Sequence, residues 1–338
     1  MDKAPLVSIV MPVRNEGGHL ATALNAIDAQ TFPASRLEIL VIDGGSTDGT
    51  LEVVRERMRS DDRVRLLGGP NVNTPLAMQL GIRAAKGEFI AKVDGHGWIN
   101  ERFIEVALGI MDDEPKVGCV GGIIEPIAAT VVERAIAAAR FSRLGVGGGV
   151  YTLAEVAQDT DTVQCGVYRL TALNEVGGFD PGLPFGEDEE LNYRLRQRGW
   201  RIRLEPEMRF RYQVRPAVSS LFRQYFRYGA ARVAVVRKHP GFLRAKHAAP
   251  AILVVTLAGG ALLAVTPQWR VVGIAPWAGY TALISIGTGY IAAANRFARV
   301  DLIASSLVAL HIGYGLGTLA GIARLFRRGG PTVAAAGM

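Results

Sequence analysis

Cysteine is scarce in this chain of 338 residues, which holds only Cys119 and Cys165. Two such cysteines form neither a disulfide framework nor a cysteine-based metal site, so we expect both thiols to be reduced. Met1 leads almost directly into a strand-like apolar run, and we therefore expect no signal peptide. Internal repeats and low-complexity tracts are also lacking, which argues against a repeat architecture.

Charge is almost absent between residues 248 and 323, although residues 1–245 mix charged and apolar side chains. Three apolar segments, at about 248–266, 271–294 and 301–323, each approach the ~20 residues needed to cross a bilayer. The basic residues before them favour a cytoplasmic N-terminal domain, yet three full spans would put the basic run 324–328 outside. We expect two or three spans in a multi-pass protein of the cell (inner) membrane.

The net charge of +7 suits nucleic acid, anionic lipid or a phosphate-bearing substrate. Zinc-finger, RNA-recognition and basic-zipper patterns are missing, so we expect no nucleic-acid partner. Lysine and arginine are densest at 223–247, directly before the apolar tail, which favours contact with membrane lipids. We therefore divide the chain into a domain at 1–215, an amphipathic interfacial basic segment at 216–247, a membrane region at 248–323 and a tail at 324–338.

Strand-like apolar runs alternate with helical spacing in the first domain. The predicted strands are 6–13, 37–43, 64–68 and 87–94, and the predicted helices are 17–30, 47–60 and 74–85. Such alternation predicts an α/β fold with a Rossmann-like, mostly parallel sheet. Ligands of such sheets bind at the carboxyl ends of the strands, where Asp43 and Asp94 lie. After Asp94 the pattern is mixed, with helices at 100–113, 170–180 and 187–200 and strands at 117–124 and 201–206.

Four motifs occur in a fixed order. They are VSIVMPVRNE (7–16), VIDGGSTDGT (41–50), GIRAAKGEFIAKVDGH (81–96) and GGFDPGLPFGEDEELNYRLRQRGWRI (177–202). Together they resemble the family 2 inverting glycosyltransferases, whose fold is GT-A, over about residues 5–230. The segments SRLGVGGGVY, CGVYRLTALNEVGGFD and FRQYFRYG are similar to the succinoglycan-biosynthesis ExoA-like glucosyltransferase subgroup, in which Asp-x-His is common at residues 94–96.

The resemblance implies a nucleotide-sugar cleft that binds a UDP-sugar. Asp43 would accept a hydrogen bond from the uracil imide, whereas the residues alone also allow it to cap the helix expected near residue 47. Arg14 has the alternative of a surface ion pair. The residues expected to line the cleft are Pro12, Arg14, Glu16, Asp43, Gly45, Ser46 and Asp94.

Asp94 and His96 are the expected metal ligands. A carboxylate at a strand end can hold Mn²⁺ or Mg²⁺ while a diphosphate supplies further oxygens. His96 would project to the same side as Asp94 if strand geometry continued for two residues. The alternative is that His96 binds the diphosphate or a loop carbonyl and no metal.

Asp188 is the expected catalytic base. By the resemblance, the aspartate of the Glu-Asp motif takes the proton of the acceptor hydroxyl, and Glu187 orients the substrate. The helix dipole at the start of 187–200 would keep the carboxylate ionised. Glu190 is expected to pair with a neighbouring arginine. The alternative for the whole acidic run is a solvated helix start.

Further residues are expected to meet the acceptor or the diphosphate. Gln224, Arg227 and Tyr228 read Gln-x-x-Arg-Tyr, where processive relatives carry tryptophan last, so processivity is doubtful. An amphipathic helix on the bilayer surface is the compatible alternative. The segment 142–151 is a candidate acceptor loop. Tyr168 and Arg169 are also candidates, the arginine for an acceptor phosphate.

We therefore expect a membrane-anchored inverting glycosyltransferase that moves a hexose, glucose above others, from a UDP-sugar to a lipid-linked saccharide. The expected setting is exopolysaccharide or cell-envelope glycan synthesis, with other glycan-assembly proteins as partners. Two alternatives remain. One is a polyprenyl-phosphate glycosyl synthase, and the other is an inactive membrane scaffold of a glycan-synthesis complex.

Overall fold

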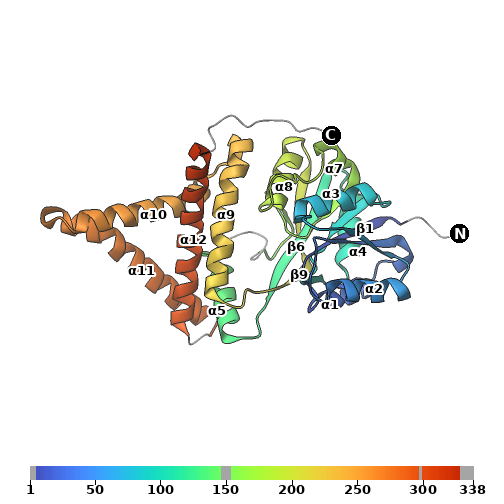
Figure 1. Cartoon of the computed structure of the whole chain (residues 1–338), viewed down its shortest axis with the longest axis horizontal. Coiled ribbons are helices and arrows are strands. Elements are labelled where there is room, and N and C mark those ends of the chain that lie inside the picture. The colour runs from blue at the N-terminus through green and yellow to red at the C-terminus, as the bar shows by residue number, and fades with distance from the viewer. Residues whose placement is uncertain (1–4, 146–153, 297–298, 328–338) are drawn as a thin grey trace. The chain divides into compact units, whose positions relative to one another are not determined.

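The computed structural model describes residues 5–145, 154–296 and 299–327, and the chain divides into two compact units (Figure 1). The first comprises Met1–Ile127 and Gly149–Gln213, and the second comprises Ala128–Gly148 and Val214–Met338. The segment 128–148, which we expected within the domain at 1–215, groups with the second unit instead.

The first unit is built on a nine-stranded sheet with the order β3-β2-β1-β4-β8-β6-β9-β5, while β7 pairs with β9. Its first four strands are parallel, as predicted from their alternation with helices. They are β1 (Val7–Val13), β2 (Leu37–Asp43), β3 (Val64–Gly68) and β4 (Phe89–Lys92). Every residue of β2 is buried, because helices cover both faces of a parallel sheet.

The remaining strands make the sheet mixed. They are β5 (Gly97–Ile99), β6 (Val117–Ile127), β7 (Gln158–Asp159), β8 (Val167–Arg169) and β9 (Arg201–Gln213). The short β8 runs antiparallel to both β4 and β6, whereas β6 and β9 are parallel. The strand expected at 201–206 is thus longer than predicted, and the strand expected at 87–94 ends at Lys92.

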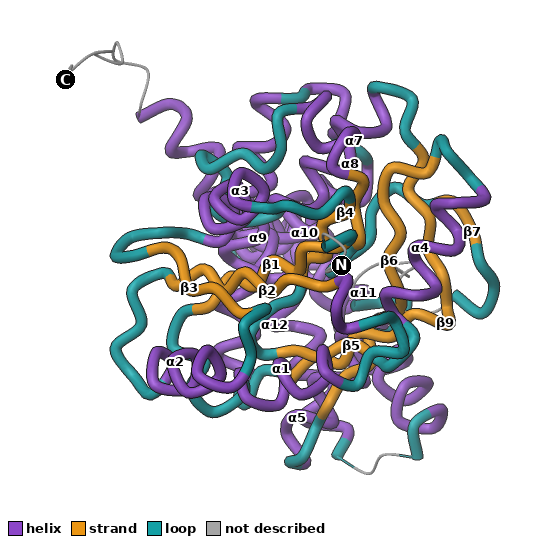
Figure 2. The backbone as a smooth tube through the Cα atoms, turned by 90° about the vertical axis from the view of Figure 1, so that its right-hand side faces the viewer, coloured by secondary structure: helices purple, strands orange, loops and turns teal. Residues whose placement is uncertain are grey.

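Helices pack on both faces of the parallel strands. Figure 2 shows α3, α7 and α8 on one face, and α1 and α2 on the other. The described helices of the first unit are α1 (Leu20–Asp28), α2 (Thr50–Ser60), α3 (Thr74–Ala84), α4 (Phe103–Asp113), α7 (Leu170–Val176) and α8 (Glu187–Gln197). The core on the α3 side contains Met78, Ile90, Leu173 and Leu191. A short 3₁₀ turn, Ala34–Arg36, precedes β2.

The second unit is helical. It contains α5 (Val131–Arg140), α9 (Val218–Lys238), α10 (Ala245–Ala264), α11 (Arg270–Ala294) and α12 (Val300–Arg327), with 3₁₀ turns at Pro240–Phe242 and Pro267–Trp269. The helices α10, α11 and α12 are long and apolar enough to cross a membrane, as the three apolar segments predicted. Helix α5 was not predicted; Thr130 and Glu133 form a capping box at its start.

Helices α9 and α12 lie side by side in the same direction (Figure 1). A Cβ atom on Gly313 would approach Phe222, and one on Gly317 would lie 2.0 Å from the carbonyl oxygen of Phe226. Glycines spaced four residues apart therefore allow the two helix backbones to approach closely. This packing covers one side of α12 with the amphipathic α9.

Candidate active site

The candidate site of the first unit lies at the carboxyl ends of β1, β2 and β4. Val13 pairs with Asp43 at the ends of β1 and β2. The loop after β1 is braced against the loop after β2, because the Asn15 N–H donates to Ser46 Oγ at 2.9 Å. The Glu16 N–H likewise donates to Thr50 Oγ1 at 2.8 Å. These bonds hold Glu16 beside the cleft expected from the sequence.

Asp43 is buried, and its carboxylate organises the turn that follows it. The N–H of Gly45 donates to Asp43 Oδ2 at 2.8 Å, and the N–H of Ser46 donates to Oδ1 at 3.1 Å. Gly45 has φ +88°, a conformation that favours glycine. Helix α2 begins only at Thr50, behind Gly49, so Asp43 does not cap it. The alternative of a helix-capping aspartate is therefore wrong.

Asp94 and His96 flank a tight turn between β4 and β5. The Gly97 N–H donates to the Asp94 carbonyl oxygen at 3.2 Å, which closes a turn. Strand geometry therefore ends before His96, contrary to the expectation that it would continue for two residues past Asp94. The imidazole is instead positioned by its contacts. Its Nδ1 lies 2.9 Å from Glu16 Oε1, and its ring meets Tyr212 edge-on at 5.8 Å.

The charge on His96 reflects these neighbours. Burial alone would lower its pKa, but the hydrogen bond to Glu16 and the charges of Asp94 and Glu16 raise the pKa to about 9. The imidazole is therefore held close to two carboxylates that favour its protonated form.

The same residues fit a divalent metal ion in part. A carboxylate on one ring nitrogen is the usual support of a metal-ligating histidine, and Glu16 takes this place at Nδ1, which leaves Nε2 of His96 as a donor. Among the described residues, no group of three or more His, Cys, Asp or Glu could hold a metal by itself. Asp94 and His96 thus suit an ion whose other ligands are diphosphate oxygens and water, as is usual for Mg²⁺.

Lys92 also belongs to the site, although it was not predicted to do so. Its side chain is only 2% exposed, and Nζ donates to both Asp188 oxygens at 2.7 Å and to Glu187 Oε1 at 3.1 Å. Burial alone would lower its pKa, but the charges of Asp188, Glu187 and Asp94 raise the pKa well above its usual value. A lysine within the apolar run GEFIAKVD was a usable signal, because a buried ammonium needs an anionic partner.

Asp188 and Glu187 open α8, behind Gly186 with φ +75°. Burial raises the pKa of Asp188 to about 7; Lys92 opposes this rise, and the charges of Glu187 and Asp94 add to it. A carboxyl group with a pKa near neutrality is suited to accept a proton and release it again.

Glu190, further along the acidic run, has a structural role. Arg194 Nε donates to Glu190 Oε1 at 2.8 Å, and Nη2 donates to Oε2 at 2.7 Å, which confirms the expected pairing of Glu190. The same guanidinium donates to the carbonyl oxygens of Val176 and Gly178. It thereby ties α8 to the GGFD turn.

Cys165 joins the site through Asp94. Its thiol lies 3.7 Å from Asp94 Oδ2 and is almost fully buried, with φ +50°. Burial and the neighbouring carboxylate of Asp94 raise the pKa of the thiol. The expectation of a reduced thiol agrees with this setting, but its place beside Asp94 was not predicted.

Tyr168 is buried beneath the site and Arg169 lies away from it, which corrects their assignment to the acceptor. Tyr168 is fully buried in the core and packs edge-on against Phe179 at 6.1 Å. Arg169 pairs in the sheet with Phe89, at the opposite end of β4 from Asp94. Its guanidinium donates to the carbonyl oxygens of Val117 and Met111. Both side chains thus serve the fold.

The other expected residues are distributed as follows. Pro12 is half-buried in β1, and Arg14 is exposed in the loop behind it. Gln224, Arg227 and Tyr228 lie on α9 of the second unit, where Gln224 Nε2 donates to the Tyr228 hydroxyl at 2.9 Å. Most of the expected acceptor loop, residues 146–151, lies outside the described residues.

Comparison with known proteins finds a family match over part of the chain. Residues 8–145 match the family model Glycosyl transferase family 2. The succinoglycan biosynthesis protein ExoA of Rhizobium meliloti is 29% identical over 315 residues, which are 91% of this chain and 92% of that protein.

A second relative comes from Methanococcus voltae. It is the dolichyl N-acetyl-alpha-D-glucosaminyl phosphate 3-beta-D-2,3-diacetamido-2,3-dideoxy-beta-D-glucuronosyltransferase, 29% identical over 69% of this chain and 74% of its own length. The mannosyltransferase PcManGT from Pyrobaculum calidifontis, solved with GDP-Man and Mn²⁺, superposes with a TM-score of 0.62 at 19% identity over 94% of this chain and 88% of its own. This likeness supports the GT-A fold, and residues 8–145 carry the match to the family 2 glycosyltransferases.

Proposed function

We propose that the protein is a membrane-anchored inverting transferase that moves a hexose, most readily glucose, from a UDP-sugar to a lipid-linked saccharide. The observation that carries this proposal is the charge cluster at the carboxyl ends of the strands. Lys92 lies two residues before Asp94 in the chain and donates to Asp188 and Glu187. The proposed proton acceptor Asp188 and the proposed diphosphate-side carboxylate Asp94 therefore share one site. The setting would be exopolysaccharide or cell-envelope glycan synthesis.

The donor would lie against the turn after β2. Asp43 keeps acceptor capacity for a base N–H besides its two backbone donors, and Gly45 and Ser46 would face the nucleotide. Pro12, Arg14 and Glu16 would line the same side. Uracil and guanine both offer an imide-type N–H, so the choice of UDP over GDP is part of the proposal.

Transfer would proceed by a single displacement. The acceptor hydroxyl gives its proton to a carboxylate oxygen of Asp188 as its oxygen forms a bond to the anomeric carbon, and the bond from that carbon to the diphosphate breaks. Attack from the opposite face inverts the anomeric centre, and UDP leaves. Glu187 would orient the acceptor. A Mn²⁺ or Mg²⁺ ion at Asp94 and His96 would neutralise charge on the diphosphate.

His96 keeps its alternative role. With Nδ1 engaged by Glu16, its Nε2 could either bind the ion or, when protonated, donate to the diphosphate directly. Both roles place His96 on the leaving-group side of the reaction.

The acceptor side would be next to the bilayer. Three candidate spans support anchoring in the cell (inner) membrane, and the basic 223–247 segment supports a cytoplasmic catalytic domain. Gln224, Arg227 and Tyr228 on α9 would meet the diphosphate or the acceptor. A relative named for action on a dolichyl-linked sugar phosphate agrees with a lipid-linked acceptor.

The test uses the full chain in mild detergent with a panel of UDP-sugars and GDP-mannose. Each donor is offered with a lipid-diphosphate saccharide or with bare polyprenyl phosphate, and products are identified by mass spectrometry. We expect one added hexose on the lipid-diphosphate saccharide, with UDP-glucose preferred. Transfer to bare polyprenyl phosphate alone would identify a polyprenyl-phosphate glycosyl synthase instead. Failure to bind or hydrolyse any donor would favour an inactive scaffold.

A further inference from the structure

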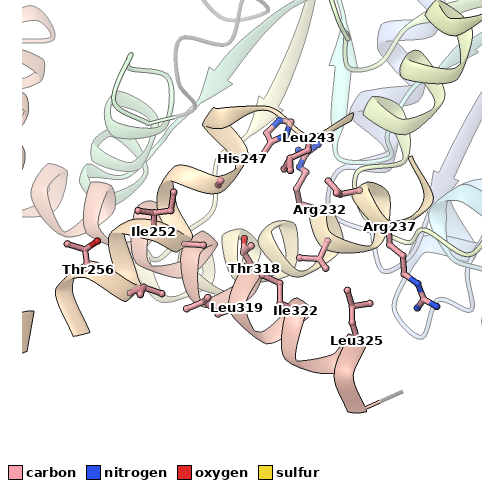
Figure 3. A pocket seen from close by; sticks show the side chains of 15 residues that line it. Arg232, Arg237, Leu243, His247, Ile252, Thr256, Thr318, Leu319, Ile322 and Leu325 are labelled. Carbon is pink, nitrogen blue, oxygen red and sulfur yellow. The ribbon is translucent and has the colours of Figure 1, made fainter. Parts of the chain in front are cut away.

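An apolar groove of about 620 Å³ runs between α9, α10 and α12 of the second unit (Figure 3). Its volume falls within the ~300–1,000 Å³ of typical ligand sites. Most of its lining is aliphatic, with Val233 from α9, Ile252 from α10, and Leu319 and Ile322 from α12. A ligand that fills it must therefore carry hydrocarbon.

Two arginines of α9 line the same groove. Figure 3 shows Arg232 and Arg237 on one side, while Ile252 and Thr256 lie toward the other end. Arg232 is held in place, because its Nε donates to the Tyr314 hydroxyl at 3.1 Å and its guanidinium lies 5.0 Å from the Phe242 ring. Arg237 is exposed. The groove thus joins a cationic end to an apolar trough.

We propose that this groove holds one anionic phospholipid of the bilayer, with its phosphate at Arg232 and Arg237 and an acyl chain along α10 and α12. Guanidinium groups bind phosphate oxygens through paired N–H donors. Basic pockets between membrane helices bind anionic headgroups in this manner. The proposal is independent of the catalytic reaction.

The choice of occupant follows from the position of the groove. Two of its walls are candidate membrane spans, so in a bilayer the groove would adjoin lipid. A site exposed to bulk lipid is filled by the most abundant lipid of matching charge, because occupancy depends on concentration over Kd. A zwitterionic phospholipid also carries a phosphate, but its ammonium group offsets the attraction to the two guanidinium charges. A free anion would leave the aliphatic lining unfilled.

The experiment measures lipids retained by the full chain in mild detergent, by native mass spectrometry. The probes are phosphatidylglycerol, phosphatidylcholine with the same acyl chains, and polyprenyl phosphate. We expect one phosphatidylglycerol to be retained in preference to phosphatidylcholine. Arg237→Gln should weaken it about fivefold, since one basic residue near anionic lipid contributes ~1 kcal/mol. The control Arg223→Gln removes an exposed α9 charge outside the groove and should change nothing.

A second pair of variants tests the apolar part. Ala248 lines the groove, whereas the adjacent Ala249 is exposed and does not. Ala248→Phe should reduce phosphatidylglycerol retention, and Ala249→Phe should not, with both variants checked for unchanged thermal unfolding.

Three results would overturn the proposal. One is equal retention of the two phospholipids. Another is an equal effect of Arg237→Gln and Arg223→Gln. The third is displacement of phosphatidylglycerol by polyprenyl phosphate at an equal mole fraction, if Arg237→Gln abolishes this displacement. The groove would then be a site for a different lipid.

Discussion

Replacing Lys92 by methionine should destabilise the first unit strongly. The substitution keeps the length of the side chain but removes the ammonium that binds both oxygens of Asp188 and one of Glu187. Two carboxylates with side chains only 15% exposed would then face each other without a counter-charge. Breaking a buried ion pair in this way costs roughly 3–5 kcal/mol. For a domain of about this size, the melting temperature should fall by roughly 6–20 °C.

The assay is thermal unfolding of the full chain in detergent, followed by tryptophan fluorescence. A double-mutant cycle separates the ion pair from packing, since Asp188→Asn removes one of the unpaired charges. In the Asp188→Asn background, Lys92→Met should cost much less than it does alone. A melting temperature within about 1 °C of wild type for Lys92→Met, or an equal loss in both backgrounds, would show that the Lys92 ammonium does not compensate the two carboxylates.

The remaining predictions concern pH, metal and helix packing. Since burial raises the pKa of Asp188 to about 7 and the base must be ionised, kcat/KM should fall as pH drops through about 7. A folded-state pKa above the unfolded value means that stability is lost as pH rises from about 4 to about 7, and Asp188→Asn should flatten this loss in a melting series. If His96 ligates the ion, His96→Asp should remain active with a changed preference between Mn²⁺ and Mg²⁺, and His96→Ala should need a higher metal concentration. Unchanged dependence of activity on Mn²⁺ and Mg²⁺ in both variants would exclude ligation by His96. Gly317→Val should lower the melting temperature by forcing α9 from α12, whereas Gly289→Val, which meets open space, should not, and equal effects would argue against close α9–α12 contact.

The parallel half of the sheet was readable from the sequence because its signals are local. The predicted strand at 37–43 coincides with β2, since a continuous apolar run bounded by a polar turn has few other interpretations. The mixed half was harder. Strand β9 was expected to end at Pro206, but the proline falls where the pairing with β6 shifts register, between Leu204 and Arg209, so no ladder N–H is lost there.

Carboxylates at strand ends were also readable, because the fold class fixes where ligands bind. Asp43 and Asp94 were proposed on that basis, Asp188 was proposed from the motif resemblance, and the structure adds Lys92 as the link between β4 and α8. Such a contact joins residues 96 positions apart, which spacing alone does not predict. Tyr168 was misassigned because a motif position does not report which face of β8 a side chain occupies.

The most direct test of the proposed mechanism compares wild type with Asp188→Asn. Transfer of labelled glucose from UDP-glucose to the lipid-linked fraction is measured beside UDP binding, both with the full chain. We expect Asp188→Asn to abolish transfer while UDP binding persists. Normal turnover by this variant would contradict the assignment of Asp188 as the base.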